Sequence, residues 1–362
     1  MHEPPNATAL DTRPVRAGEE LDWARLETWL RATLSGSEID GLDLRERMQV
    51  AQFPGGHSNL TYHVRFGTTE LVVRRPPFGP VPPTAHDMAR EYRWLSAVHH
   101  VFPLAPRAYA FCDDPSIVGS PFYVMERRQG VVIRDEEPLP IKNKVGVRRG
   151  VSLATIDALA GLHAIDIAAA GLSHLGKPHG FVERQVRGWS ERWNRSKTSD
   201  VPNMEALARW LVDSLPPNPA RPTIVHGDFK LDNLMLDAAY PCRLVAVFDW
   251  EMAALGDPLV DLGILLAYWA ANASAAGPRD SLATVTTLPG WLTSRELVER
   301  YAARSGRDLT TLRFFEVFAL FKIAVVIQQI YYRFVHGQTS DPRFAHFGDR
   351  VTYLAERAAS LL

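Results

Sequence analysis

The stretch from residue 224 to residue 262 carries more reactive polar side chains among apolar residues than any other part of the chain. Its polar members occur in a fixed order: His226, Asp228, Lys230, Asn233 and Asp249. Five positions separate Asp228 from Asn233, and Asp249 follows an apolar run that is typical of a strand. This pattern is used to hold the metals of a nucleotide beside an acceptor hydroxyl, and it therefore indicates phosphoryl transfer.

Each polar residue of this stretch fits a separate task in that chemistry. The carboxylate of Asp228 can orient an acceptor hydroxyl and accept its proton. Asn233 and Asp249 offer the oxygen ligands that Mg²⁺ prefers, and Lys230 can offset the charge of the transferred phosphoryl group. His226 is interpreted as a scaffold residue, because the pattern already supplies a carboxylate base. A single aspartate more often caps a helix or a turn, so the prediction depends on the combined spacing.

Composition indicates a globular protein of one large domain or two modest ones. The chain has 362 residues, of which 46% are hydrophobic, and this suffices for a substantial core. The 40 basic and 41 acidic residues nearly cancel. Because no strong net field results, we expect no nucleic acid and no membrane as a partner. The motif pattern instead predicts a small molecule with a hydroxyl group as the acceptor.

Three further features bear on the location of the protein. Cys112 and Cys242 form neither a CxxC pair nor a zinc ligand set, which favours a reduced, cytoplasmic compartment. Residues 1–19 lack the features of a secretory signal and are expected to form a disordered tail. Residues 314–332 are apolar but include charged side chains such as Lys322, so they predict a buried helix rather than a membrane span.

The first part of the chain, residues 20–126, is expected to form a nucleotide-binding lobe. Apolar residues at helical spacing predict helices at 20–34 and 84–99. Runs rich in β-branched and apolar residues predict an antiparallel sheet with strands at 47–53, 60–66, 69–75, 108–112 and 121–126.

Two connections in this lobe are candidate nucleotide contacts. The turn between the first two expected strands contains small and polar residues: Gly55, Gly56, Ser58 and Asn59. Its backbone can approach phosphate oxygens closely, although a Gly-Gly turn taken alone is more often only a hairpin. Glu126 ends the last strand, and the following backbone to Gly130 is expected to meet an adenine edge, unless it is an ordinary exit from a strand.

Residues 127–362 are expected to form a mainly helical lobe for catalysis and acceptor binding. Apolar residues in steps of three and four predict helices at 151–164, 180–196 and 203–214. Short apolar runs predict strands at 222–226, 234–236 and 244–249. A small antiparallel sheet followed by a helical lobe gives an α+β fold class.

Several motifs together resemble the catalytic core of the aminoglycoside phosphotransferase and choline kinase-like families, which are distant relatives of protein kinases. They are HGDxxxxN at 226–233, Asp249-Trp250, GDPLVDLG at 256–263, FPGGHSNLTYHV at 53–64, VVRRPP and AREYRWL at 89–95. The chain is most similar to the kinase-like domain that is fused to, or encoded near, acyl-CoA dehydrogenase-like proteins. The resemblance covers roughly residues 40–340.

This resemblance implies a bilobal protein kinase-like fold and a reaction that uses ATP and Mg²⁺. Position by position, it implies that Asp228 is the catalytic base and that Asn233 and Asp249 are metal ligands. It also implies that Glu91 is the helix partner of the cation that binds phosphate.

That cation is where the chain departs from the family pattern. Arg74 stands in place of the usual strand lysine, with Arg75 as a nearby alternative. Arginine stays charged and contacts phosphate through two donors, but its planar fork is not interchangeable with an ammonium group. Taken by itself, Glu91 could instead be a solvated glutamate that pairs with a neighbouring arginine.

Other residues around the motifs have more than one interpretation. Asp257 is interpreted as a loop brace, and Asp261 as a structural residue that opens or braces the helix after it. Glu251 could face the metals or the substrate, and the alternative that it faces neither is left open. Six aromatic residues of the helical lobe could line an acceptor pocket, although such residues more often belong to the core: Trp189, Trp193, Tyr268, Trp269, Tyr331 and Tyr332.

The acceptor is the least constrained part of the prediction. Aminoglycosides are polycations and would favour an acidic cleft, but the helical lobe has no acidic run. The resemblance instead suggests a hydroxy acid or hydroxyacyl-CoA and a functional link to an acyl-CoA dehydrogenase. Two alternatives remain: a nucleotide-binding pseudokinase with a regulatory role, motivated by Arg74, and a hydrolase that uses the same carboxylates and metal.

Overall fold

The chain divides into two compact units in the computed structural model. The first unit comprises residues 1–130 and 245–251, and the second comprises residues 131–244 and 252–362. The structure describes residues 11–54, 59–79, 87–269, 282 and 285–362. Each unit is considered separately below.

The first unit is built on a five-stranded antiparallel sheet with the order β1-β2-β3-β5-β4. Its strands are β1 Met48–Gln52, β2 Leu60–Phe66, β3 Thr69–Arg75, β4 Ala108–Cys112 and β5 Phe122–Glu126. Buried and partly exposed residues alternate along β2, as expected for a strand with one face in a core. All five strands lie where the sequence predicted them.

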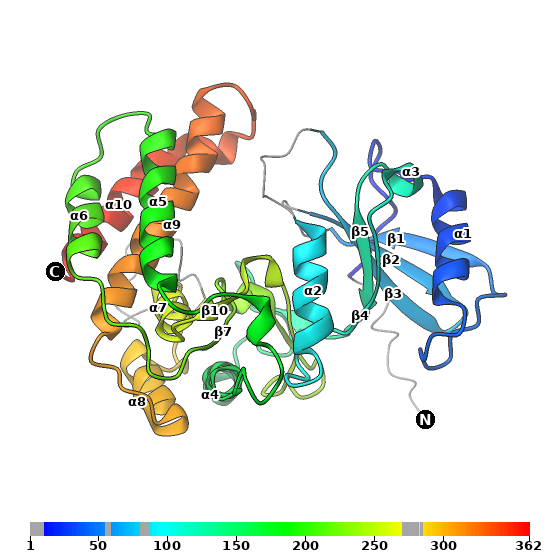
Figure 1. Ribbon diagram of the computed structural model, residues 1–362, viewed down its shortest axis with the longest axis horizontal. Helices are drawn as coiled ribbons and strands as arrows, with labels where there is room; N and C mark the ends of the chain where they lie inside the picture. The colour runs from blue at the N-terminus through cyan, green and yellow to red at the C-terminus, as the bar shows by residue number, and fades with distance from the viewer. Residues whose placement is uncertain (1–10, 55–58, 80–86, 270–281, 283–284) are drawn as a thin grey trace. The chain divides into compact units, whose positions relative to one another are not determined.

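Two helices cover opposite faces of this sheet (Figure 1). Helix α1, Trp23–Leu34, buries Leu26, Leu30 and Leu34 against one face. Helix α2, Met88–Val98, lies on the other face and begins after Asp87, whose side chain accepts a hydrogen bond from Arg90 N. The sequence predicted a helix from residue 84, but residues 80–86 lie outside the described part of the chain. A short helix, α3 (Pro115–Val118), was not predicted.

Part of the expected tail is ordered against the sheet. Arg13 and Gln52 exchange two backbone hydrogen bonds of 2.8 Å, and Arg16 N donates to Gln52 Oε1 at 2.9 Å. The expectation of disorder therefore does not hold for residues 11–19, because an edge strand offers backbone partners that no local pattern reveals. Residues 1–10 lie outside the described part of the chain.

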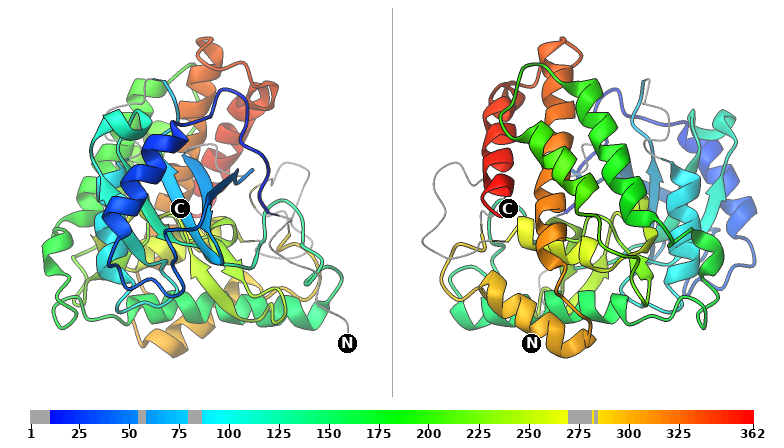
Figure 2. Two further views of the ribbon diagram at one scale, coloured as in Figure 1. Left: turned by 90° about the vertical axis from the view of Figure 1, so that its right-hand side faces the viewer. Right: turned by 60° about the vertical axis from the view of Figure 1, so that its left-hand side comes forward.

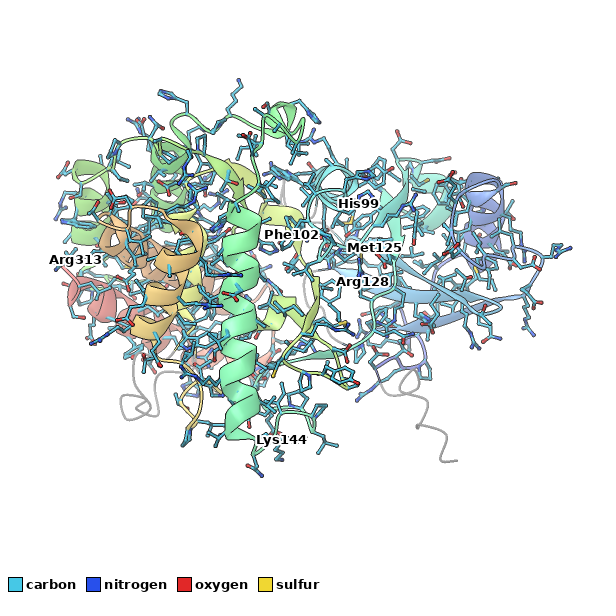
Figure 3. All side chains as sticks on the ribbon, turned by 90° about the horizontal axis from the view of Figure 1, so that it is seen from below. His99, Phe102, Met125, Arg128, Lys144 and Arg313 are labelled. Carbon is cyan, nitrogen blue, oxygen red and sulfur yellow. The ribbon has the colours of Figure 1, made fainter. Side chains whose placement is uncertain are left out.

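The second unit is mainly helical. Its helices are α4 Val145–His163, α5 Phe181–Ser196, α6 Met204–Asp213, α7 Leu259–Ala267, α8 Ser294–Ser305, α9 Leu312–Val335 and α10 Phe347–Ala359. Helix α4 follows Lys144 (Figure 3) and begins before the predicted start at 151. Arg148, in the first turn of this helix, forms a buried ion pair with Glu137, 2.6 Å from Nε to Oε1.

Short strands frame the catalytic stretch. β7 Thr223–Val225 pairs with β10 Ala254–Gly256, and β6 Val131–Val132 pairs with β8 Leu234–Leu236, both antiparallel. β9, Leu244–Val247, begins in the second unit and leads into residues 245–251 of the first. Short 3₁₀ turns occur at Ser173–Leu175, Leu231–Asn233, Trp250–Met252 and Pro342–His346. The α+β class predicted from the sequence is confirmed.

Helix α9 is the central helix of the second unit, packed between α5, α6, α7 and α10 (Figure 2). It is long and apolar enough to cross a membrane, but 72% of its most apolar window is buried within the protein, as expected for a core helix. Gly263 of α7 meets α9 closely, since a Cβ atom there would lie 2.4 Å from Phe315 O. The prediction of a buried helix at 314–332 is thus confirmed.

Candidate active site

The loop from His226 to Asn233 brings three predicted site residues together in the second unit. Asn233 Nδ2 donates to the backbone oxygen of Asp228 at 2.8 Å and to Asp228 Oδ2 at 3.0 Å. Lys230 Nζ lies 3.1 Å from the same carboxylate oxygen. Phe229 is fully buried and anchors the loop. The loop therefore fixes the Asp228 carboxylate from two sides.

Charges around this carboxylate keep it ionised. Burial alone would raise the pKa of Asp228, but Lys230 and Lys322 outweigh burial and lower it. Burial likewise opposes the charge of Lys230, but Asp228 and Tyr268 raise the Lys230 pKa above its usual value. Lys230 Nζ also lies 4.8 Å from the ring centroid of Tyr268. At neutral pH the loop thus presents an anion and a cation in contact.

The side-chain amide of Asn233 is oriented by Asp228. Because its nitrogen makes both hydrogen bonds to Asp228, the amide oxygen points away from that carboxylate. An amide oxygen is a suitable ligand for a hard cation. The sequence-based assignment of Asn233 as a metal ligand is consistent with this orientation.

Asp261 of α7 supports the loop through hydrogen bonds to its backbone. Its side chain is fully buried and accepts hydrogen bonds from His226 N at 2.6 Å and Gly227 N at 2.7 Å. His163 Nε2 lies 3.2 Å from Asp261 Oδ2. Asp261 is therefore structural, as the sequence predicted, but it braces the loop from His226 rather than the helix that follows it.

His226 and Asp257 also have structural contacts. His226 is fully buried, and its Nδ1 accepts a hydrogen bond of 3.3 Å from Asp228 N. Asp257 Oδ1 accepts a hydrogen bond of 2.9 Å from Leu259 N at the start of α7. His226 has the contact within the loop that the sequence predicted, whereas Asp257, predicted to brace a loop, instead binds the first residue of α7.

In the first unit, Arg74 is placed between two carboxylates. Its Nε lies 3.1 Å from Glu91 Oε2, and its Nη2 lies 3.0 Å from Asp249 Oδ1. Arg75 projects to the other face of β3, where its guanidinium lies 3.9 Å from the ring centroid of Phe78. Arg74, rather than Arg75, is therefore the partner of Glu91.

The ion pair between Arg74 and Glu91 is buried, and this decides the role of Glu91. Only 1% of Glu91 is exposed, which excludes the solvated alternative. Burial opposes the charge of Arg74, yet Glu91, Tyr123 and Asp249 together raise its pKa. Burial raises the pKa of Glu91, and the Arg74 cation counteracts this shift. A buried carboxylate of this kind needs its cation, because an unpaired charge there is costly.

Asp249 has an unusual backbone conformation. Its φ of 67° lies in the left-handed region, which among the described non-glycine residues is shared only with Asn143 and Asn203. Such conformations cost energy and gather at functional sites. Asp249 adopts this conformation at the end of its apolar strand, where its carboxylate contacts Arg74.

The remaining predicted nucleotide contacts are only partly described. Gly55, Gly56 and Ser58 lie outside the described residues. Asn59 Nδ2 lies 3.5 Å from Glu251 Oε2, so Glu251 contacts the end of the glycine turn. Arg90 Nε donates to Glu251 O at 3.2 Å.

Glu126, at the end of β5, is held by neighbouring arginines. Its Oε2 accepts a hydrogen bond of 3.1 Å from Arg107 N and lies 3.0 Å from Arg128 Nη2. Arg128 (Figure 3) also donates to Pro103 O at 3.0 Å. The Glu126 side chain is thus engaged within the first unit.

A cavity lies beside Lys230 in the second unit. Its lining combines charged and apolar residues: Arg134, Asp135, Lys230, Leu231, Asp232, Leu265, Tyr268, Trp269, Leu282, Val285 and Thr286. Two of the six aromatic residues singled out in the sequence, Tyr268 and Trp269, contribute to it, whereas Trp189 and Trp193 are buried in the core. Burial raises the pKa of Tyr268 to about 12.

Sequence reasoning missed most residues of this cavity. Asp232 lies inside the catalytic loop and could have been noticed from its place between Lys230 and Asn233. Arg134 and Val285 belong to segments without a motif, so no local signal marked them. Arg134 and Val285 line the cavity together with Leu265 of α7 because the folded chain brings these distant segments together.

The profile of the phosphotransferase enzyme family matches residues 49–315. The chain belongs to this family. Its resemblance to acyl-CoA dehydrogenase family member 11 of Rattus norvegicus is 33% identity over 97% of this chain and 44% of that protein. Family member 10 of Mus musculus is also 33% identical, over 96% of this chain and 32% of that protein. The chain therefore spans less than half the length of these relatives.

Solved structures share the fold. A candidate aminoglycoside phosphotransferase from Ralstonia eutropha has a TM-score of 0.77 and 29% identity, covering 94% of this chain and 98% of that one. An ethanolamine kinase from Plasmodium vivax has a TM-score of 0.58 at 11% identity, and the match covers 92% of this chain and 88% of that one. The protein kinase-like fold and the family resemblance predicted from the sequence are confirmed.

Replacing Asp261 by asparagine tests the support of the loop. Asp261→Asn puts an amide NH₂ where an oxygen now accepts a backbone N–H, so we expect the free energy of unfolding to fall by about 3 kcal/mol. Urea denaturation measures this. Asp157→Asn is the matched control: Asp157 pairs with Arg300 at a partly exposed site, and its loss should cost about 1 kcal/mol or less. Equal losses for the two variants would contradict the bracing role of Asp261.

Proposed function

We propose that the protein transfers the γ-phosphoryl group of Mg-ATP to a hydroxyl group of a small molecule, and that the acceptor is a hydroxy acid or a hydroxyacyl-CoA. The observation that carries this proposal is the contact of Asp228 with both Lys230 and Asn233 beside a cavity. Family membership supports phosphoryl transfer, and the arrangement supplies a residue for each part of it.

In this proposal Asp228 and Lys230 act on the reacting groups. Asp228 orients the acceptor hydroxyl and accepts its proton, and its ionised state at neutral pH suits that task. Lys230, 3.1 Å from Asp228, offsets negative charge on the transferred phosphoryl group. Positioning supplies much of the rate in this chemistry, so a rigid loop is an advantage.

Asn233 and Asp249 are the proposed Mg²⁺ ligands. No cluster of three or more acidic, histidine or cysteine side chains suited to a metal occurs among the described residues. Two protein ligands fit Mg²⁺ nevertheless, since this ion is usually bound through one or two carboxylates together with phosphate oxygens and water. The ion, when bound, would neutralise charge on the nucleotide phosphates.

Arg74 and Glu91 form the proposed phosphate-binding pair. The guanidinium stays charged and is fixed by Glu91, so it can meet an anion without losing its buried partner. The turn residues are proposed to contact the nucleotide phosphates, and Glu126 to lie at the adenine edge. The turn residues are Gly55, Gly56, Ser58 and Asn59.

The acceptor proposal rests on the cavity and on the relatives. Leu265, Trp269 and Val285 give the cavity an apolar wall, while Arg134 supplies a cation for a carboxylate or phosphate. Its two basic and two acidic residues give no excess negative charge for a polycation. The relatives named as acyl-CoA dehydrogenase family members support an acyl substrate and a functional link to such a dehydrogenase.

A substrate panel tests the proposed acceptor. The protein is incubated with Mg-ATP and, separately, with free hydroxy acids, the matching hydroxyacyl-CoA thioesters and aminoglycosides, and products are identified by mass spectrometry. We expect a phosphorylated hydroxy acid or thioester. Transfer to aminoglycosides alone would overturn the acceptor assignment.

The same panel separates the other candidate functions. A pseudokinase, which the arginine at position 74 motivates, would bind Mg-ATP without giving any phosphorylated product. A hydrolase would release phosphate at a rate that no acceptor changes, whereas a kinase should form phosphorylated product in step with the ATP consumed.

Asp228→Asn tests the proposed base. The variant keeps a similar shape but cannot accept the proton, so we expect kcat to fall by about 100- to 10,000-fold while the affinity for ATP changes little. Initial rates and nucleotide titrations measure the two effects. Wild-type turnover in this variant would refute the assignment of Asp228.

Asp249→Asn tests the proposed metal ligand without adding backbone strain. Asparagine tolerates the left-handed conformation of this position, and Arg74 keeps Glu91 as a partner. We expect the Mg²⁺ concentration needed for half-maximal nucleotide binding to rise about tenfold or more, because a charged ligand is lost. An unchanged Mg²⁺ dependence would show that Asp249 is not the main ligand.

A further inference from the structure

Helix α9 carries a buried lysine that neither the family motifs nor the proposed reaction uses. Only 7% of Lys322 is exposed. Burial lowers the pKa of its ammonium, although Asp228 and Asp261 counteract this shift. Lysine is among the residues least often buried, since removing its charge from water is costly. A lysine at this position therefore needs a reason beyond filling the core.

The hydrogen-bond partner of Lys322 is the carbonyl group directly before the proposed base. Its Nζ donates to Gly227 O at 2.5 Å. This carbonyl belongs to the peptide whose nitrogen is Asp228 N, and Asp228 N itself donates to His226 Nδ1 at 3.3 Å. Both ends of the peptide that leads into Asp228 are thus occupied.

The preceding peptide is fixed as well. Gly227 N donates to Asp261 Oδ1 at 2.7 Å, and Gly227 has a φ of 84° that favours glycine. A Cβ atom at Gly227 would lie 2.8 Å from Met252 O, so this position has no room for a side chain. A carboxylate of α7 and an ammonium of α9 therefore hold the two polar groups of one glycine.

Neighbouring groups partly offset the cost of burying the Lys322 cation. The negative groups facing it are Asp228 and Asp261, and the positive ones are Lys230 of the loop and Arg192 of α5. Its Nζ also lies 5.4 Å from the ring centroid of Trp189, another residue of α5. The aromatic face and the two carboxylates stabilise the charge that burial disfavours.

We propose that Lys322 is a positioning residue for phosphoryl transfer: it holds the Gly227 carbonyl so that the following residue, Asp228, presents its carboxylate in one orientation. This inference rests on the proposed role of Asp228 as the base. Without Lys322, the Gly227–Asp228 peptide has no donor for its carbonyl and can rotate about its neighbouring bonds. The carboxylate then samples orientations that do not meet the acceptor hydroxyl.

Lys322→Met tests the proposal against a matched control on the same helix. Gln328 is also buried on α9 and also donates to a backbone carbonyl, Ser196 O at 2.7 Å, but outside the catalytic loop. We expect Lys322→Met to lower kcat by about 10- to 100-fold with KM for ATP within about twofold, and Gln328→Met to leave both within about twofold. Thermal unfolding verifies that each variant is folded during the assay.

A double variant distinguishes positioning of Asp228 from a general loss of structure. If Lys322 acts through Asp228, adding Lys322→Met to Asp228→Asn should lower the residual rate by less than about threefold, because the two changes disable one unit. A further fall as large as in the wild-type background would overturn the proposal. So would a folded Lys322→Met enzyme with wild-type kcat.

Two more substitutions at Lys322 test whether a cationic donor is what matters and replace a variant that does not fold. Lys322→Arg retains a cationic donor and should recover part of the lost kcat, whereas equal rates for Lys322→Arg and Lys322→Met would count against the proposal. If Lys322→Met does not fold, Lys322→Gln is measured in the same way. Wild-type turnover in Asp228→Asn alone would instead show that the proposed base is wrong, which separates the failure of that assignment from a failure of Lys322.

Discussion

The hydrogen bonds from His226 N and Gly227 N to the buried carboxylate of Asp261 are the interaction on which the catalytic loop depends. They link α7 to the loop and satisfy two backbone donors that burial would otherwise leave without water. With Lys322 on the carbonyl side, the loop is held by charged groups from two core helices. The close packing of α7 against α9 at Gly263 brings Asp261 and Lys322 near the same loop.

In the first unit, charged side chains likewise fix one another, here on a strand and the helix that covers the sheet. Arg74 of β3 is placed between Glu91 of α2 and Asp249, so a charged triplet is built into a sheet and the helix that covers it. Arg74 and Glu91 are buried and depend on each other, since removing either leaves a charge without compensation, whereas the more exposed Asp249 is an additional partner. The planar fork of the arginine allows it to contact both carboxylates at once.

Local patterns accounted for most of the secondary structure. The five strands of the sheet and the buried α9 helix were predicted, because alternation and apolar content are properties of neighbouring residues. The exceptions depend on distant partners. Residues 11–19 are ordered by the edge of β1, and α4 begins early where Arg148 meets Glu137.

The sequence by itself therefore determined the fold class, the family and the order of the catalytic residues. Only the tertiary structure decided which arginine meets Glu91, which aromatic residues line the cavity beside Lys230, and where the ammonium of Lys322 lies. Lys322 and Gly227 are 95 positions apart, and no periodicity relates them. Contacts of this kind arise from the packing of whole helices, whereas a motif records only residues that are close along the chain.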